Sequence, residues 1–89
     1  MRAHIKINGQ VQGVFFRRSA KIKADELGIV GWVKNCDDGS VEVMAQAEKK
    51  QVDQFIKWCK KGPPFAKVAK IQFDWEEGTG EFSGFDVRY

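Results

Sequence analysis

The chain has 89 residues, which suits one domain with a modest core, and 43% of them are hydrophobic. This composition excludes a disordered chain, and a net charge of +3 falls well short of the basic density of a nucleic-acid binder. No apolar run approaches the ~20 residues needed to cross a bilayer, and the two cysteines form no C-x-x-C pair. We therefore expect one soluble, cytoplasmic domain over residues 1–89, with reduced thiols and no membrane partner.

The spacing of apolar residues divides the chain into strands and helices. Alternation of apolar and polar residues predicts strands over 4–11, 29–34, 41–46, 69–76 and 85–89. Apolar residues at helical spacing predict helices over 16–27 and 48–61. Gly28 ends the first helix and Gly62-Pro63-Pro64 ends the second, while residues 35–39 form a tight polar turn between two strands.

The order of these elements is βαββαβ, followed by a short extra strand. Right-handed crossovers make the first and second strands parallel, and the hairpin reverses the third strand. The two helices must then share one face of a mainly antiparallel sheet. The sequence therefore predicts an α+β fold, a ferredoxin-like sandwich. This fold hosts many activities and does not by itself indicate one.

Residues 7–17 connect the first strand to the first helix through two glycines. The start of a helix leaves several backbone N–H groups unpaired, and the helix dipole attracts anions there. No Ser, Thr, Asp or Asn lies between Gly9 and Arg18 to cap these donors, and Arg17 adds a charged fork suited to phosphate. The loop lacks both G-x-G-x-x-G and the Gly-Lys-Ser/Thr ending of a nucleotide loop. It predicts a pocket for a phosphoryl group, the alternative being an ordinary turn whose N–H groups bind water.

Two stretches resemble the signatures of the acylphosphatases. The first signature is matched at Ile7, Gly9, Val11, Gln12, Gly13, Val14, Phe16 and Arg17. The second is matched at Gly31, Trp32, Val33, Lys34, Asn35, Gly39 and Val41. The chain departs from the second pattern at Ala47, where the family usually has glycine. The resemblance covers essentially the whole chain and implies hydrolysis of acyl phosphates to carboxylate and inorganic phosphate, without a metal or cofactor.

The resemblance also implies roles for particular residues. Arg17 would bind the substrate phosphate, together with the backbone amides of Gln12, Gly13, Val14, Phe15 and Phe16, and Asn35 would orient the attacking water. We expect inorganic phosphate to be both the product and a competitive inhibitor, and the protein to be a monomer.

Topology indicates which parts of the chain meet at this site. The first two strands are predicted to be parallel, so their carboxyl ends share one edge of the sheet, and Asn35 should lie beside the Gln12–Arg17 loop. We also expect Gly62–Pro64 at the rim of the pocket, where Lys60 and Lys61 could help to capture the anion. One of Phe15 and Phe16 should be buried beneath the loop.

Other candidate catalytic groups are weaker. His4 lies about 20 Å from the loop, at the opposite end of the first strand. Cys36, next to Asn35, could act as a thiol nucleophile, but nothing nearby in the sequence would activate it. No cluster of His, Cys, Asp and Glu has the spacing of a metal site.

Two alternatives belong to other functional classes. One is a non-catalytic module that binds RNA or a small regulatory ligand. The aromatic run of ferredoxin-like RNA binders is absent, and the residues expected on the open sheet face are His4, Lys6, Asn8, Glu42 and Gln46. The other alternative is an accessory domain for carbamoyl phosphate chemistry in a larger enzyme.

Overall fold

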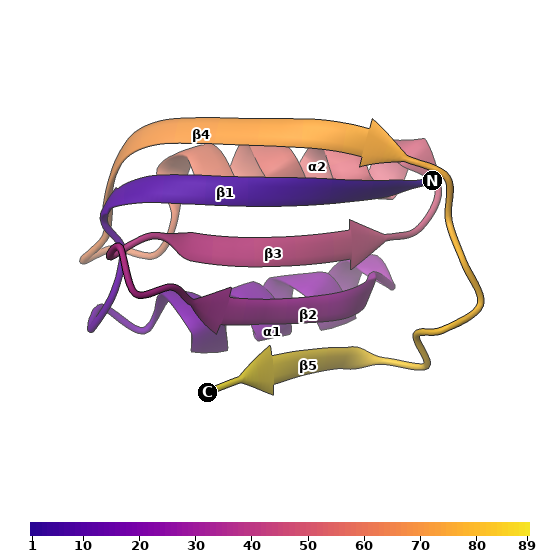
Figure 1. The fold of residues 1–89 in the computed structure, drawn as a ribbon, viewed down its shortest axis with the longest axis horizontal. Coiled ribbons are helices and arrows are strands. Elements are labelled where there is room, and N and C mark those ends of the chain that lie inside the picture. Colours follow the sequence, from indigo (N-terminus) through magenta and orange to yellow (C-terminus); the bar gives the residue numbers. More distant parts are fainter.

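The computed structural model describes residues 1–89 as two helices packed on one face of a five-stranded sheet (Figure 1). The elements are β1 (Arg2–Gln10), α1 (Phe16–Leu27), β2 (Val30–Asn35), β3 (Val41–Gln46), α2 (Lys49–Lys61), β4 (Lys67–Glu76) and β5 (Phe85–Arg88). The predicted ferredoxin-like sandwich with an extra C-terminal strand is therefore confirmed. Each helix matches its predicted range to within one residue.

The strands lie in the order β4-β1-β3-β2-β5. Strand β1 is antiparallel to β3 and β4, and β3 is antiparallel to β2, which makes β1 and β2 parallel as predicted. Strand β5 adds to the sheet in parallel with β2. The carboxyl ends of β1, β2 and β5 consequently lie at the same edge, on the left of Figure 1.

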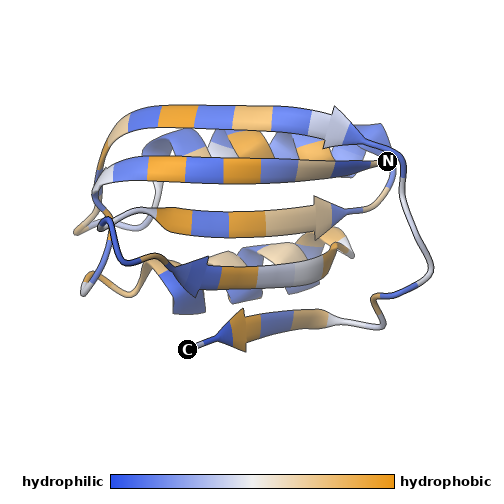
Figure 2. Ribbon diagram, viewed as in Figure 1, coloured by the Kyte–Doolittle hydropathy of each residue, from blue (hydrophilic) through white to orange (hydrophobic).

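The core lies between the sheet and the helices. Alternate residues of the central strands point into it, which Figure 2 shows as bands of hydrophobic and hydrophilic colour. From β1 the residues Ala3, Ile5 and Ile7 are fully buried. Helix α2 contributes its predicted apolar face of Val52, Phe55, Ile56 and Cys59. Removing these side chains from water supplies the main favourable free energy of folding.

Strand β1 leaves the sheet at a glycine that no other residue could replace without a shift of the backbone. The pairing of β1 with β4 changes register between Asn8 and Gly9. A Cβ atom on Gly9 would lie 2.2 Å from the carbonyl oxygen of Lys67, far inside van der Waals contact, and Gly9 has φ 131°. This close approach lets β1 stay paired almost to its end before the chain turns toward α1.

Candidate active site

The loop between β1 and α1 has an unusual backbone. Gly13 has φ 74°, and Phe15, the residue before α1, has φ 64°. Phe15 is the single non-glycine residue with positive φ in the chain. A left-handed conformation of a bulky residue costs of order 1–3 kcal/mol and persists where the surroundings require it. The helix start is thus held in a strained, defined shape.

Backbone donors at this helix start are free, as the sequence suggested. No side chain caps α1, and no backbone N–H group from Gln12 to Arg17 donates a hydrogen bond to another group of the chain. The first bond of the helix runs from the Ser19 N–H to the Phe15 carbonyl. The loop therefore presents a row of unpaired donors at the positive end of a helix dipole.

Phe15 and Phe16 point to opposite sides of this loop. The Phe16 side chain is 2% exposed and packs against Trp58, with 5.4 Å between the ring centroids. The Phe15 side chain is 66% exposed. The prediction that one of the two anchors the loop from beneath is confirmed, and Phe16 is the anchor.

Arg17 lies in the first turn of α1 and contacts the C-terminal end of the chain. Its Nη1 donates a hydrogen bond to the Arg88 carbonyl oxygen over 3.1 Å. The guanidinium carbon lies 4.6 Å from the centroid of the Tyr89 ring. Since β5 runs parallel to β2, its last residues arrive at the edge where the loop lies. Arg17 is therefore oriented by a carbonyl and an aromatic ring.

Arg17 and Asn35 line the same hollow, of about 650 Å³. Asn35 is the last residue of β2, so the parallel arrangement of β1 and β2 places it beside the loop. The complete lining is Val11, Gly13, Phe15, Phe16, Arg17, Arg18, Lys21, Ile22, Asp25, Asn35, Val87 and Tyr89. Three cationic side chains and one carboxylate surround this space, which favours an anionic ligand. Of the predicted site residues, Gln12 and Val14 do not line it.

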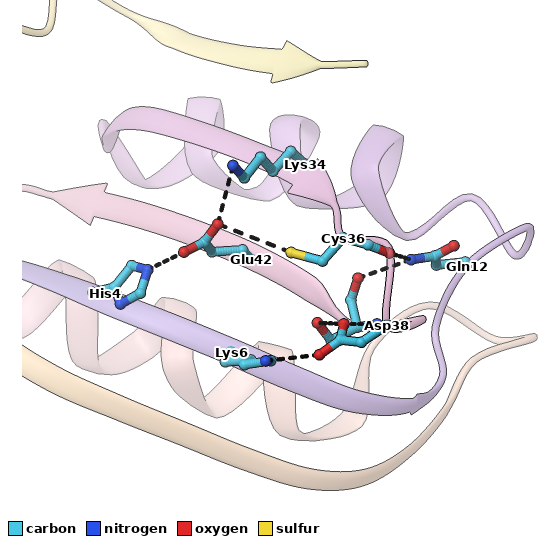
Figure 3. Close-up of polar contacts among 8 residues, drawn as sticks. His4, Lys6, Gln12, Lys34, Cys36, Asp38 and Glu42 are labelled. Carbon is cyan, nitrogen blue, oxygen red and sulfur yellow. Dashed lines mark hydrogen bonds and ion pairs between the residues drawn. The ribbon is translucent and has the colours of Figure 1, made fainter.

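Gln12 instead ties the loop to the hairpin that follows Asn35. Its side-chain Nε2 donates to the carbonyl oxygens of Cys36, over 2.7 Å, and of Ser40, over 2.9 Å (Figure 3). These two carbonyls belong to the β2–β3 connection. The Gln12 side chain thus fixes the distance between the β1–α1 loop and the end of β2. The spacing of residues in the sequence did not indicate this role of the Gln12 side chain.

The hairpin is further held by Asp38. Its carboxylate accepts hydrogen bonds from the Ser40 backbone N–H and hydroxyl and lies 2.8 Å from the Lys6 Nζ (Figure 3). The hydrogen bond from Lys6 is the largest influence on the Asp38 carboxylate, and the bonds from Ser40 are the next largest. Together they hold the pKa of Asp38 well below its usual range. Asp38 in turn raises the pKa of Lys6. This ion pair joins β1 to the turn after Asn35.

His4 and Cys36 both contact Glu42 on the open face of the sheet, away from the hollow. The His4 ring bonds to the Glu42 carboxylate, Lys34 Nζ lies 3.3 Å from it, and the Cys36 thiol lies 3.9 Å from it (Figure 3). Burial is the largest influence on Glu42 and raises its pKa, but the bonds from His4 and Lys34 outweigh it and the pKa is lowered. Neither His4 nor Cys36 lines the hollow.

The loop after α2 does not reach the rim where it was expected. Gly62–Pro64 and Lys61 line a second hollow of about 590 Å³, on the other side of α1, and Lys60 lines neither. The Phe16 ring separates the two places, because a Cβ on Gly62 would lie 2.9 Å from its Cε2 atom. The expectation that Lys60 and Lys61 lie at the site is therefore wrong.

The structure contains no group of three or more His, Cys, Asp or Glu side chains arranged to hold a metal ion. No helix is both long enough and apolar enough to cross a bilayer.

Comparison with known proteins places the chain in a family. The family model described as Acylphosphatase matches residues 3–87. An acylphosphatase of Pelotomaculum thermopropionicum is 42% identical over 88 residues, which are 99% of this chain and 96% of that protein. The crystal structure of acylphosphatase from Bacillus subtilis has a TM-score of 0.95 at 35% identity and covers 99% of this chain and 98% of its own. HypF of T. kodakarensis has a TM-score of 0.85 at 28% identity. The match covers 100% of this chain and only 12% of that longer chain.

The match to the family model spans the two stretches that resemble the acylphosphatase signatures, residues 7–17 and 31–41. The relatives that match along their full length share the fold as well as the sequence. This chain is a hydrolase that belongs to the acylphosphatase family.

Proposed function

We propose that this enzyme hydrolyses the carboxyl–phosphate anhydride of small acyl phosphates to a carboxylate and inorganic phosphate, without a metal or cofactor. One observation carries the proposal. Arg17 and Asn35 line a single hollow at a helix start whose backbone donors have no partner within the chain. The site offers donors and positive charge, and no titrating side chain is needed for the chemistry proposed here.

The loop and Arg17 bind the phosphoryl group. The N–H groups of Gln12, Gly13, Val14, Phe15 and Phe16 donate to its oxygens, and the Arg17 guanidinium supplies further donors and a permanent positive charge. Such fixed donors stabilise the charge on the phosphoryl oxygens as the transition state forms. The strained backbone at Phe15 keeps the donors aimed before the substrate arrives.

Asn35 holds the attacking water through its side-chain amide. The water oxygen forms a bond to phosphorus as the bond from phosphorus to the acyl oxygen breaks. The carboxylate leaves with the electron pair and needs no proton, and a phosphate oxygen of the substrate accepts the proton of the water. A general acid or base is therefore not required, which agrees with the position of His4 outside the hollow.

The hollow is larger than a phosphoryl group. Beyond Arg17 it is lined by Phe15, Val87 and Tyr89, which offer apolar surface to the acyl part of a substrate. Small acyl phosphates with different acyl groups would thus fit the same phosphate-binding end.

Hydrolysis of benzoyl phosphate tests the proposal. With a chelator present, the rate should be unchanged, and added inorganic phosphate should raise KM without lowering the maximal rate. No hydrolysis would overturn the assigned substrate class. Loss of activity in chelator, with recovery on adding a divalent ion, would overturn the metal-free mechanism.

A further inference from the structure

The hollow that contains Arg17 and Asn35 continues along the first turns of α1. Arg18, Ile22 and Asp25 belong to its lining. Ile22 also lines the second hollow, so it marks the far limit of the first. Since the whole space measures about 650 Å³, the part beyond the loop can hold an acyl group that carries a substituent of its own.

Two of the three cations in this lining already have partners. Arg17 donates a hydrogen bond to the Arg88 carbonyl oxygen and is the proposed partner of the phosphoryl group. Lys21 Nζ donates to the Phe85 carbonyl oxygen over 2.9 Å and lies 3.2 Å from the Asp25 carboxylate. Both side chains therefore reach toward β5, to which the two accepting carbonyls belong.

The third cation, Arg18, has no partner. Its exposed side chain makes no hydrogen bond, ion pair or ring contact within the chain. The residues one turn away on the helix include no acidic group and are Val14, Phe15, Lys21 and Ile22. The positive charge of Arg18 is thus uncompensated in the free protein.

Arg18 also lies at a different part of the hollow from Arg17. Consecutive residues of an α-helix leave its axis about 100° apart. Arg17 is held toward β5 by Arg88 and Tyr89, so Arg18 lies at the outer, solvent-facing rim. Phe15 and Ile22, both exposed, are its neighbours there on the helix surface. Apolar surface therefore lies beside a free guanidinium, at the end of the hollow away from the phosphate loop.

We propose that Arg18 gives this site a preference for acyl phosphates whose acyl group carries a second negative charge, such as the monophosphates of dicarboxylic acids. The inference rests on the proposed function, because it concerns the acyl end of the same substrate. With the phosphoryl group at the loop, the acyl group lies along Phe15 and Ile22, and its anionic substituent meets the Arg18 guanidinium. This contact is the same in the ground state and the transition state, so it lowers KM and leaves kcat unchanged.

Two substrates of similar shape and different charge test the proposal. One, para-carboxybenzoyl phosphate, carries the second anion, and the other, para-carbamoylbenzoyl phosphate, has a neutral amide in its place. The ratio of their kcat/KM values measures the preference, and comparing this ratio between variants cancels the intrinsic reactivity of the substrates. At low ionic strength, Arg18→Gln should lower the ratio about three- to fivefold, the effect expected of an exposed ion pair. The change should lie in KM, with kcat within about twofold.

Further variants separate the position of the charge from its amount. Arg18→Glu should lower the ratio further, and Arg18→Lys should keep most of it, because the position recognises charge. Lys57→Gln and Lys57→Glu make the same changes in net charge on α2, at a residue that lines neither hollow, and should leave the ratio unchanged. Added salt should reduce the preference of the unaltered chain, since charges at an exposed rim are screened.

The role of Arg18 is excluded by a ratio that Arg18→Gln leaves unchanged, or that Lys57→Gln lowers equally. Equal losses for both substrates in Arg18→Gln leave the ratio unchanged and would instead place Arg18 on the phosphoryl group. A change in kcat alone would likewise contradict a contact that acts through binding. The failure of this inference differs from that of the proposed function. No hydrolysis of either substrate would remove the function itself, whereas hydrolysis of both without a charge preference would remove only the role of Arg18.

Discussion

Arg17 and Arg88 are 71 positions apart in the chain, and the Arg17 guanidinium donates a hydrogen bond to the Arg88 main-chain carbonyl over 3.1 Å. A guanidinium has five N–H donors, so four remain for a ligand. The Tyr89 ring lies against the same group. Because the side chain is already oriented, binding a phosphoryl group costs less conformational entropy than it would for a free arginine.

This arrangement predicts an effect of the last side chain on substrate affinity. Tyr89→Ala should raise KM for benzoyl phosphate about two- to fivefold with little change in kcat, because a cation–π contact at an exposed site contributes about 0.5–1 kcal/mol. Tyr89→Phe keeps the ring and should behave as the unaltered enzyme. Steady-state kinetics of the two variants decide the matter. A fall in kcat alone would show that the ring does not act through binding.

Removing either proposed catalytic side chain should have a much larger effect. Asn35→Ala should lower kcat by about 10²–10³ with KM little changed, because the water-orienting group acts in the transition state. Arg17→Ala should lower kcat further and also raise KM, and Arg17→Lys should not rescue it, since a point charge lacks the planar fork of donors. Lys57→Ala, an exposed charge on α2, is the control. Near-normal turnover of either Ala variant would remove that residue from the mechanism.

Gln12 should matter as much for the shape of the site as for stability. Its amide donates to the carbonyl oxygens of Cys36 and Ser40 in the β2–β3 connection. Gln12→Glu places a carboxylate against both oxygens and should lower the free energy of unfolding by about 1–3 kcal/mol, with a loss of activity. Gln12→Ala removes the donors without adding charge and should be the milder change. Urea unfolding and kinetics of both variants would contradict this reading if Glu and Ala behaved alike.

The lowered pKa of Asp38 predicts how the stability of the protein changes at acid pH. Its pKa is lowered in the folded protein, so its pairing with Lys6 stabilises the fold at pH values above the unfolded pKa of about 3.9 and is lost as pH falls toward the folded value. Asp38→Asn should therefore lower Tm at pH 7, and its difference in Tm from the unaltered protein should shrink as the pH falls below about 3.9. Asp37→Asn, the neighbouring substitution, is the control. Thermal scans showing a constant difference at all pH values would contradict the assignment.

Much of the site follows from the sequence because it depends on local pattern and topology. The strand–glycine–helix run and the absence of a capping side chain predict the free donors at Gln12–Phe16. The parallel direction of β1 and β2 follows from the order of elements, and it alone brings Asn35 beside Arg17. The alternation of residues also predicts which side of each central strand is buried.

The contacts that the sequence did not predict depend on packing between distant elements. The alternation of Phe85 and Val87 indicates a strand but not its partner, and the position of Tyr89 against Arg17 follows from the parallel pairing of β5 with β2. The loop after α2 was misplaced for a similar reason. Its position depends on the Phe16 ring, which fills the space between Gly62 and the hollow.

The Glu42 cluster supplies the last prediction, which concerns the residues most often used as nucleophile or base. His4 and Cys36 contact Glu42 on the open face and do not line the hollow. Cys36→Ser should keep kcat and KM within about twofold, since a serine of similar size preserves the hairpin while removing the thiolate nucleophile. His4→Gln should likewise leave turnover and its pH profile unchanged. A large loss of rate in Cys36→Ser, with the fold intact by circular dichroism, would make the thiol part of the chemistry and displace Asn35 from its proposed role.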